Sequence, residues 1–322
     1  MQAIRIQRTG GPHVLELADC PTPEPGADEL LVRNRACGVN FIDIYHRTGL
    51  YPVDLPATLG LEGAGEVEAV GEAVTGFAPG DRVAYANAPG ADAEYLTVPA
   101  RFAVHVPDAL SLETAAAAML QGMTAHAFTH STVQIEPGAW VLIHAAAGGA
   151  GQLLVQMAKR LGAQVIGTVS SEEKAAVART RGADHIILYT QEDFVARTRE
   201  ITGGEGVHVV YDSVGQSTFL KDFDVLRRRG TLVLFGQSSG PVEPFNPALL
   251  VQRGSLYLTR PILFDYIAER AELEWRANDL LGWLADGSLE IAVDRSLPLR
   301  DAAEAHELLA GRHTTGKLLL IP

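Results

Sequence analysis

The chain has 322 residues, more than the roughly 250–300 at which single hydrophobic cores stop growing, so two domains are expected. Apolar residues make up 47% and charged residues 20%, and no apolar run reaches the ~20 residues that cross a bilayer, which excludes a membrane-spanning helix. The net charge of −13 disfavours nucleic acid, because negative charges repel phosphate backbones. Two cysteines, Cys20 and Cys37, are too few for a disulfide framework or a closed zinc site and predict a cytoplasmic protein with reduced thiols.

The first 120 residues are expected to form short strands. Residues 1–11 (MQAIRIQRTGG) alternate polar and apolar side chains as a strand does, and they lack the apolar segment of a signal peptide. A helix is predicted at residues 40–49, where Phe41, Ile44 and Tyr45 share one face, and helices begin again near Ser111. The strands are predicted in the runs AIRIQ, ELLVRNRA, GAGEVEAVG, DRVAY and AEYLTV, as in a compact β-barrel-like domain.

Strand and helix alternate regularly after Trp140. This alternation predicts right-handed crossovers and a parallel, doubly wound sheet. Its strands are predicted in the runs WVLIHA, QVIGTV, HIILY, VHVVYDSV, TLVLFG and SLYLTRP, with helices between the first four. The run RRRG at residues 227–230 is interpreted as the solvated end of a helix.

The C-terminal residues again mix predicted helices and strands, as the N-terminal residues do. The helices are predicted in AELEWRANDLLGWLADG and DAAEAHELLAG, and the strands in VDRSLPL and GKLLLIP. The final strand does not resemble the strands in the middle of either domain. The C-terminal segment is therefore expected to return to the first domain and complete it. The predicted domains are residues 1–122 with 266–322, and residues 123–265.

A turn rich in glycine and alanine joins the first strand of the alternating region to its helix. In residues 145–151 (AAAGGAG), Ala146, Gly148 and Gly151 occupy the three positions of the dinucleotide fingerprint G-x-G-x-x-G, with alanine at the first. Gly148 would let the backbone approach a pyrophosphate, and Gly151 would let the helix pack on the strand. Helix amides that begin near Gly149 would face the phosphates, so the turn predicts a nucleotide site.

The end of the next strand predicts which dinucleotide binds. An acid about 20 residues after the turn usually binds a free ribose 2′-hydroxyl, but Ser170 and Ser171 stand there instead. With Lys174 on the following helix, this pattern favours the 2′-phosphate of NADP over NAD. Glu172 and Glu173 lie close by and are interpreted as favourable acids at a helix N-terminus. The alternative for Lys174 is a solvated surface lysine.

The chain resembles the medium-chain dehydrogenase/reductase superfamily over essentially its whole length. The motifs that carry this resemblance are CGVNFID (37–43), LGLEGAGEVEAVGEAV (59–74), GDRVAY (80–85), LQGMTAHA (120–127) and AAAGGAG (145–151). Three more resemble its zinc-free, NADPH-dependent quinone oxidoreductase branch, which includes the ζ-crystallin-like enzymes: VVYDSVG (209–215), FGQSSG (235–240) and TTGKLLLIP (314–322). The resemblance implies an α/β fold with a GroES-like β-barrel domain and a Rossmann domain whose doubly wound parallel sheet has six strands.

The resemblance also implies that no metal is bound. Alignment with the motifs of zinc alcohol dehydrogenases places Asn40, Leu61 and Leu120 at the three positions that hold the catalytic zinc. Leucine cannot ligate zinc, and a catalytic zinc site needs about three protein ligands. Cys37 lies three residues early, without a Cys or His partner in these motifs, and the cysteine-rich structural zinc lobe is absent.

The implied activity is transfer of hydride from NADPH to a quinone. A quinone is already an electrophile, and hydride transfer yields a stabilised hydroquinone anion that water can protonate, so positioning is most of the catalysis. We therefore expect no strong general base and assign no catalytic residue. Two alternatives stay open: a zinc-free, NADPH-dependent reductase of the C=C bond of enones or enoyl thioesters, and a non-catalytic NADPH-binding protein with a structural or RNA-binding role.

Site residues follow from the glycine turn and from the resemblance. Other roles stay open for Asn40 as a helix N-cap, for Tyr45 and Tyr51 as core and loop-covering aromatics, for Thr124 as a residue bonding its own helix, and for Tyr189 as an ordinary strand end. The quinone pocket is expected to contain Asn40, Tyr45 and Tyr51. NADPH is expected to contact Asn40, Tyr51, Thr124, Gly148, Gly149, Ala150, Gly151, Ser170, Lys174, Tyr189, Phe235, Gly236, Ser238, Phe264 and Lys317.

The resemblance further implies a homodimer, because the family commonly pairs edge strands of its Rossmann sheets. The run SLYLTRP (255–261) is the expected edge, since an uncovered apolar edge strand would otherwise promote aggregation.

Overall fold

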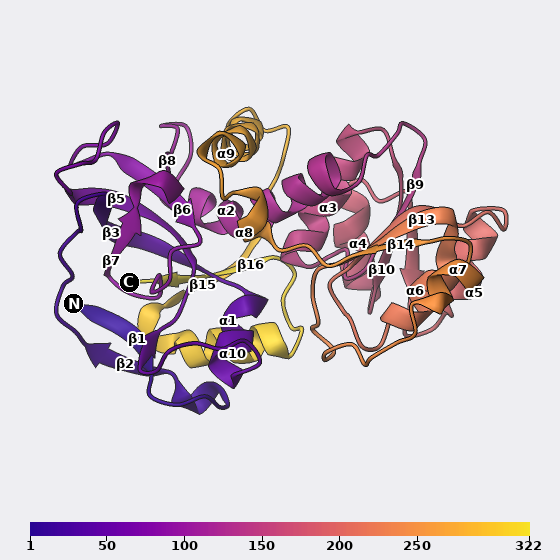
Figure 1. The fold of residues 1–322 in the computed structure, drawn as a ribbon, viewed down its shortest axis with the longest axis horizontal. Coiled ribbons are helices and arrows are strands. Elements are labelled where there is room, and N and C mark those ends of the chain that lie inside the picture. The colour runs from indigo at the N-terminus through magenta and orange to yellow at the C-terminus, as the bar shows by residue number, and fades with distance from the viewer. The chain divides into compact units, whose positions relative to one another are not determined.

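The computed structural model describes residues 1–322 and divides them between two units, Met1–Met123 with Tyr266–Pro322 and Thr124–Asp265 (Figure 1). The domain boundaries predicted from the sequence lie at these positions or one residue from them. Both units mix helices with strands, as the fold-class prediction requires. None of the helices has the length and apolar character needed to span a bilayer.

The first unit is built on a seven-stranded sheet and a three-stranded sheet. The larger sheet has the order β15 (Val293–Pro298), β16 (Lys317–Ile321), β3 (Glu29–Val39), β5 (Glu62–Val70), β6 (Arg82–Ala86) and β8 (Ala103–His105), and β7 (Tyr95–Pro99) also pairs with β3. The smaller sheet has the order β2 (Glu16–Asp19), β1 (Gln2–Ile6) and β4 (Ala57–Thr58). The predicted strands of this domain are confirmed.

Four helices lie close to predicted positions: α1 (Phe41–Thr48), α2 (Leu112–Ala127), α9 (Arg270–Ala285) and α10 (Ala302–Ala310). The short helix α8 (Leu263–Tyr266) was not predicted. Short 3-10 turns occur at Pro12–Val14, Ala100–Phe102 and Leu299–Asp301, and a π-turn at Phe128–Thr132 follows α2. Helix α1 begins directly after Asn40, which has the extended backbone of an N-cap residue.

The second unit contains a parallel sheet of six strands, which confirms the predicted doubly wound sheet. Its order is β11 (His185–Leu188), β10 (Gln164–Val169), β9 (Trp140–Ile143), β12 (Val207–Asp212), β13 (Leu226–Leu234) and β14 (Tyr257–Thr259). Helices α3 (Gly149–Arg160), α4 (Glu172–Thr180), α5 (Phe194–Ile201), α6 (Phe219–Val225) and α7 (Ala248–Gln252) connect the strands. Successive strands run outward from β9 in one direction and then from β12 in the other, so the order reverses between them.

The arginine run at residues 227–230 was predicted wrongly as a helix end. Helix α6 ends at Val225, and the arginines belong to the first half of β13. Leu226 is buried and pairs with Val207, and the register shifts between Val207 and Val209. This irregularity lets exposed side chains such as Arg228 pass at the surface while both ends of the strand stay in the core.

The last strand of the chain completes the sheet of the first unit, as predicted. In Figure 1 the yellow strand β16 lies among the indigo and purple strands of the N-terminal residues. It pairs antiparallel with β3 through Leu318–Val39, Leu319–Gly38 and Leu320–Cys37, and parallel with β15. Its apolar side chains enter a core shared with α1 and α10, so the tail is part of the first unit's hydrophobic core.

We predict that Leu320→Ala destabilises the first unit by about 2–5 kcal/mol, because a buried leucine is lost and a cavity remains. Leu17→Ala is the matched control in the same unit; its side chain is 39% exposed, and about 0.5 kcal/mol or less is expected. Urea denaturation of both variants measures the difference. Equal denaturation midpoints would show that the tail strand does not support this core.

Candidate functional site

Five loops leave the parallel sheet of the second unit at one edge. Because β9 to β13 are parallel, the segments that follow their carboxyl ends emerge together, which is where open α/β sheets bind ligands. These segments are residues 144–148, 170–171, 189–190, 213–218 and 235–240. Together with the first turns of α3 and α4, they carry most of the predicted cofactor residues of this unit: Gly148, Gly149, Ala150, Gly151, Ser170, Lys174, Tyr189, Phe235, Gly236 and Ser238.

The glycine turn holds the start of α3 tightly against β9. Ala145 adopts a left-handed backbone with φ 51°, and its carbonyl accepts a hydrogen bond of 2.9 Å from Gly148 N–H. A Cβ on Gly151 would lie 2.2 Å from the Ala145 carbonyl oxygen, so only glycine allows the helix to approach this closely. This is the packing that the sequence predicts for Gly151. The first N–H groups of a helix have no partner within it, so the start of α3 offers donors to an anion.

The ends of β10 and β11 are joined by hydrogen bonds. Tyr189 N–H donates to the Val169 carbonyl at 3.2 Å, and the Thr190 hydroxyl donates to the Ser170 carbonyl at 3.0 Å. These bonds place Tyr189, whose side chain is 44% exposed, beside Ser170 and the start of α4, which carries Lys174. The three side chains predicted to bind a 2′-phosphate therefore lie at the ends of two adjacent strands and on the first turn of α4.

The two acids beside Lys174 are engaged in contacts of α4 itself. Ser171 is the N-cap residue and accepts a hydrogen bond from Lys174 N–H at 3.4 Å. A hydrogen bond with Ser171 lowers the pKa of the Glu173 carboxyl. Glu172 lies 3.6 Å from the guanidinium of Arg179, which is about two turns further along the same helix. Both acids thus have the helix-terminal role that the sequence analysis gave them.

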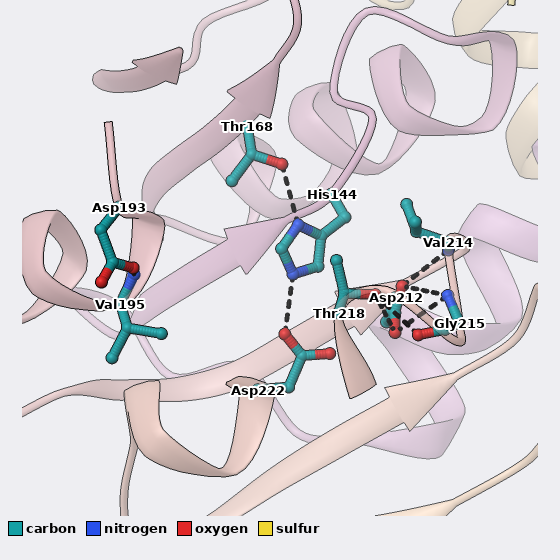
Figure 2. Close-up of polar contacts among 9 residues, drawn as sticks. All are labelled: His144, Thr168, Asp193, Val195, Asp212, Val214, Gly215, Thr218 and Asp222. Atoms are coloured by element: carbon teal, nitrogen blue, oxygen red, sulfur yellow. Dashed lines mark hydrogen bonds and ion pairs between the residues drawn. The ribbon is translucent and has the colours of Figure 1, made fainter. Parts of the chain in front are cut away.

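Asp212, at the carboxyl end of β12, organises two loops and was missed from the sequence. Its buried carboxylate accepts hydrogen bonds from Val214 N–H (2.6 Å), Gly215 N–H (3.1 Å) and the Thr218 hydroxyl (2.9 Å), as Figure 2 shows. Its backbone carbonyl accepts a bond of 2.8 Å from Phe235 N–H. The motif YDSVG carries the signal, because an Asp that ends a strand often bonds backbone amides two residues on.

The loop after β13 lies directly against the loop after β12. Ser238 N–H donates to the Ser213 carbonyl at 3.2 Å, and a Cβ on Gly236 would lie 2.4 Å from the same carbonyl oxygen. The Phe235 ring meets the Phe128 ring edge-on, with centroids 5.3 Å apart. The structure therefore fixes the predicted residues Phe235, Gly236 and Ser238 in one loop at the carboxyl edge.

A buried histidine network, also missed from the sequence, lies beneath the glycine turn. The imidazole of His144 lies between Thr168 on β10 and Asp222 on α6 (Figure 2). Its Nδ1 is 2.8 Å from Thr168 Oγ1, and its Nε2 is 2.8 Å from Asp222 Oδ1. The side chains of His144 and Asp222 are 2% and 0% exposed. His144 and Asp222 are 78 positions apart in sequence, and neither lies in a motif that pairs them.

Another buried polar cluster, formed by Asn40, Glu62 and Lys317, lies in the first unit. Asn40 Nδ2 donates to the Gly38 carbonyl at 3.0 Å and to Glu62 Oε2 at 2.8 Å. The Lys317 ammonium donates to Asn40 Oδ1 at 2.7 Å and to Glu62 Oε2, and Leu120 N–H donates to Glu62 Oε1. Lys317 and Glu62 are fully buried. The predicted residues Asn40 and Lys317 thus contact each other, although 277 positions separate them.

The remaining predicted residues are found in three different environments. Tyr45 is 9% exposed, and its ring centroid lies 6.3 Å from that of Phe41 and 5.2 Å from that of Tyr51. Thr124 is buried in α2, and Phe264 is half-buried in α8. Tyr45 therefore packs within the first unit, and the ligand contacts assigned to these residues stay predictions.

No set of three or more His, Cys, Asp or Glu side chains in residues 1–322 is arranged to hold a metal ion. Of the positions aligned with zinc ligands, Leu61 is buried, Leu120 is half-buried, and Asn40 is bonded to Lys317 and Glu62.

Comparison with known proteins places these features in a family. The family model described as alcohol dehydrogenase GroES-like domain matches residues 26–108, and the model described as zinc-binding dehydrogenase matches residues 149–274. A quinone oxidoreductase of Pseudomonas aeruginosa is 48% identical, over 99% of both chains. The chain belongs to the quinone oxidoreductase family of the medium-chain dehydrogenase/reductase superfamily.

Two further relatives carry names that state different activities. The crystal structure of Escherichia coli quinone oxidoreductase complexed with NADPH matches with a TM-score of 0.98 and 45% identity, over 100% of both chains. A 2-haloacrylate reductase of Burkholderia is 43% identical, over 100% of this chain and 99% of its own.

The carboxyl edge of the second unit fits NADPH. The start of α3 offers amide donors, and Lys174 follows the strand end that lacks an acid. These features match two needs of this cofactor, which are donors for a pyrophosphate and a cation for a 2′-phosphate. Gly151 and Gly236 serve the packing of the protein itself, since a Cβ on either would collide with the backbone carbonyl oxygen of Ala145 or Ser213.

We predict that Lys317→Met destabilises the first unit by about 3–5 kcal/mol, because the buried Glu62 carboxylate loses its only charged partner in the cluster. The double variant Lys317→Met, Glu62→Gln is expected to regain most of this loss, since no uncompensated charge remains. Urea denaturation of the two variants and of the unaltered protein checks the difference. Equal destabilisation of the single and double variants would contradict the role given to this ion pair.

Proposed function

We propose that the protein is an NADPH-dependent quinone reductase that works without a metal. The observation that carries the proposal is the carboxyl edge of the second unit, where the glycine turn and the strand end with Lys174 lie together in a fold matching an NADPH-complexed quinone oxidoreductase. Full-length identity of 48% to a quinone oxidoreductase supports the same reaction. The relatives reported above carry the names of enzymes, and nothing favours the non-catalytic alternative.

The residues of the second unit would bind the two charged parts of the cofactor. The amides at the start of α3, from Gly149 onward, would bind the pyrophosphate. Lys174, with Ser170 and Tyr189, would bind the 2′-phosphate, while the carboxylates of Glu172 and Glu173 make contacts within α4. The loop that carries Phe235, Gly236 and Ser238 is held in place by the loop after β12.

When bound, NADPH supplies a hydride from its nicotinamide ring to the acceptor. The chain's own contribution is to hold the nicotinamide ring and the acceptor in the geometry that hydride transfer needs. We keep Tyr45 and Tyr51 as proposed residues of the acceptor pocket, and Thr124 and Phe264 as proposed cofactor contacts. For Lys317 the proposed contact is restricted, because its ammonium is buried and bonded to Asn40 and Glu62.

The hydrogen bonds of Asn40 define what it can offer to a ligand. Both Nδ2 hydrogens are used by Gly38 and Glu62, and one lone pair of Oδ1 is used by Lys317. Asn40 also takes part in a capping box with Asp43 at the start of α1, and it is 3% exposed. The proposed contact of Asn40 with cofactor or acceptor is therefore restricted in the same way as that of Lys317.

Reduction of a C=C bond conjugated to a carbonyl or carboxyl group is the second candidate function. The relative named 2-haloacrylate reductase, at 43% identity over the full chain, favours it. Both candidate reactions deliver hydride to an electrophilic carbon, so the binding of NADPH does not distinguish them. Turnover of 1,4-benzoquinone against that of 2-chloroacrylate and an enone does.

We predict that Lys174→Ala weakens NADPH binding about 10- to 100-fold, because a hydrogen bond to a charged group contributes about 1.5–3 kcal/mol. The KM for NADH should change little, since NADH has no 2′-phosphate. The assay follows oxidation of NADPH and NADH with 1,4-benzoquinone and 9,10-phenanthrenequinone, before and after treatment with a chelator. Loss of activity after chelation, a preference for NADH, or turnover of the enone alone would each refute the proposed reaction.

We also propose a homodimer that forms through β14. This strand pairs only with β13 in the sheet, and Tyr257 on it is 56% exposed. A second copy would cover an edge that otherwise invites aggregation. A cytoplasmic location stays a prediction, supported by the two free cysteines.

Sedimentation at micromolar concentration is expected to give the mass of two chains, and Tyr257→Asp is expected to give the mass of one. Leu220→Asp is the control, because this 58% exposed side chain lies on α6 rather than on the edge strand. A single-chain mass for the unaltered protein would rule out the dimer.

A further inference from the structure

The buried network of His144, Thr168 and Asp222 has no part in the reaction proposed above, yet it supports the turn that would receive the cofactor. We propose that His144 is a positioning residue for NADPH, which fixes the phosphate-binding turn and whose network gains a proton when the cofactor binds. This inference rests on the proposed NADPH binding and deepens it.

His144 is anchored to both neighbouring strands of β9. Its backbone N–H donates to the Tyr211 carbonyl on β12 at 3.1 Å, and its ring reaches Thr168 on β10. Thr168 is bonded twice to this segment, because its carbonyl also accepts a hydrogen bond of 3.2 Å from Ala146 N–H. The turn that begins at Ala145 therefore cannot shift without breaking contacts of the His144 network.

The network accepts His144 in either protonation state. Thr168 Oγ1 can donate to Nδ1 of a neutral imidazole or accept from Nδ1–H of an imidazolium, because a hydroxyl does both. Nε2–H donates to Asp222 Oδ1 in both states. A proton can thus be gained or lost without leaving a buried nitrogen unpaired, and the turn keeps its shape.

The charged groups around the imidazole favour the protonated state. Asp222 Oδ2 is buried without a hydrogen-bond donor, and the Asp212 carboxylate at the end of β12 also acts on the ring. From α5 the ring meets only Phe194, with centroids 5.0 Å apart, and the Asp193 carboxylate of the same helix start bonds Val195 N–H at the surface (Figure 2). The facing groups are therefore two carboxylates and no second cation.

These neighbours set the direction of the pH dependence. Burial lowers the pKa of His144, but the Asp222 and Asp212 carboxylates outweigh it and place this pKa above its ordinary value of 6.5. Burial and the Asp212 carboxylate raise the pKa of Asp222 as well, so His144 and Asp222 hold one proton between them across the 2.8 Å contact of Nε2 and Oδ1. A pyrophosphate at the turn adds negative charge and favours a proton on the network. NADPH binding is therefore strongest at low pH and weakens as the pH rises through these raised pKa values.

The test is calorimetric titration of NADPH into the full chain between pH 7 and 9, in two buffers of different ionisation enthalpy, which reports both Kd and proton uptake. In the unaltered protein Kd should rise by up to about tenfold per pH unit over the range in which a proton is taken up, and it should level off where uptake ceases. His144→Gln should bind about tenfold more weakly at pH 7, with a flat pH profile and no proton uptake. The same series with NADH removes the titration of the 2′-phosphate.

Asp222→Asn is the second variant, because it keeps the side-chain shape and removes the charge; it should also abolish proton uptake between pH 7 and 9. His208→Gln is the matched control, a half-buried histidine on β12 whose Nδ1 accepts from Trp140 N–H at 3.0 Å, and it should leave Kd and its pH profile unchanged. Equal Kd and proton uptake in the unaltered protein, His144→Gln and Asp222→Asn would overturn this inference. Failure of the unaltered protein to bind NADPH would instead overturn the proposed function.

Discussion

The reversal of strand order between β9 and β12 is the constraint on which the site in the second unit depends. Because both strands are parallel and their helices lead away in opposite directions, their carboxyl ends are left open to a ligand. The glycine turn follows one strand, and Asp212 ends the other. The hydrogen bonds of His144 cross the same point, joining β9 to β10, β12 and α6. The nucleotide edge is thus held by buried polar contacts as well as by the backbone of the turn.

In the first unit, a buried ion pair is bonded to Asn40, one of the positions that alignment with zinc alcohol dehydrogenase motifs places at a zinc ligand. A lysine–glutamate pair without exposure to water is stable only if its other hydrogen-bonding groups are satisfied, and Asn40 and the Leu120 amide supply those bonds. The pair depends on the last strand of the chain, which places Lys317 beside β3. The fold of this unit and the state of its polar cluster therefore depend on the same six C-terminal residues, 317–322.

Patterns that are local in sequence predicted most of the fold and part of the site. Each strand–helix–strand repeat spans only about 30 residues, so its pattern of apolar runs and amphipathic helices is visible in the local sequence. The parallel sheet could therefore be predicted before its packing was known. The turn at 145–151 and the residues after β10 were assigned to the cofactor in the same way, because each motif is contiguous, and these contacts stay predictions. The arginine run at 227–230 was misjudged, because charged residues at the start of a strand resemble a solvated helix end when the bulge cannot be seen.

The sequence by itself determined the two-unit α/β architecture, the glycine turn between β9 and α3 and the absence of zinc-type ligands at Leu61 and Leu120, because these follow from side-chain chemistry and short-range spacing. Only the tertiary structure decided that Lys317 neutralises Glu62 and that His144 meets Asp222. Each of these pairs joins residues far apart in the chain, and nothing in the local pattern distinguishes a buried histidine or lysine from an exposed one. Their charges acquire partners only when strands from distant segments come to lie side by side.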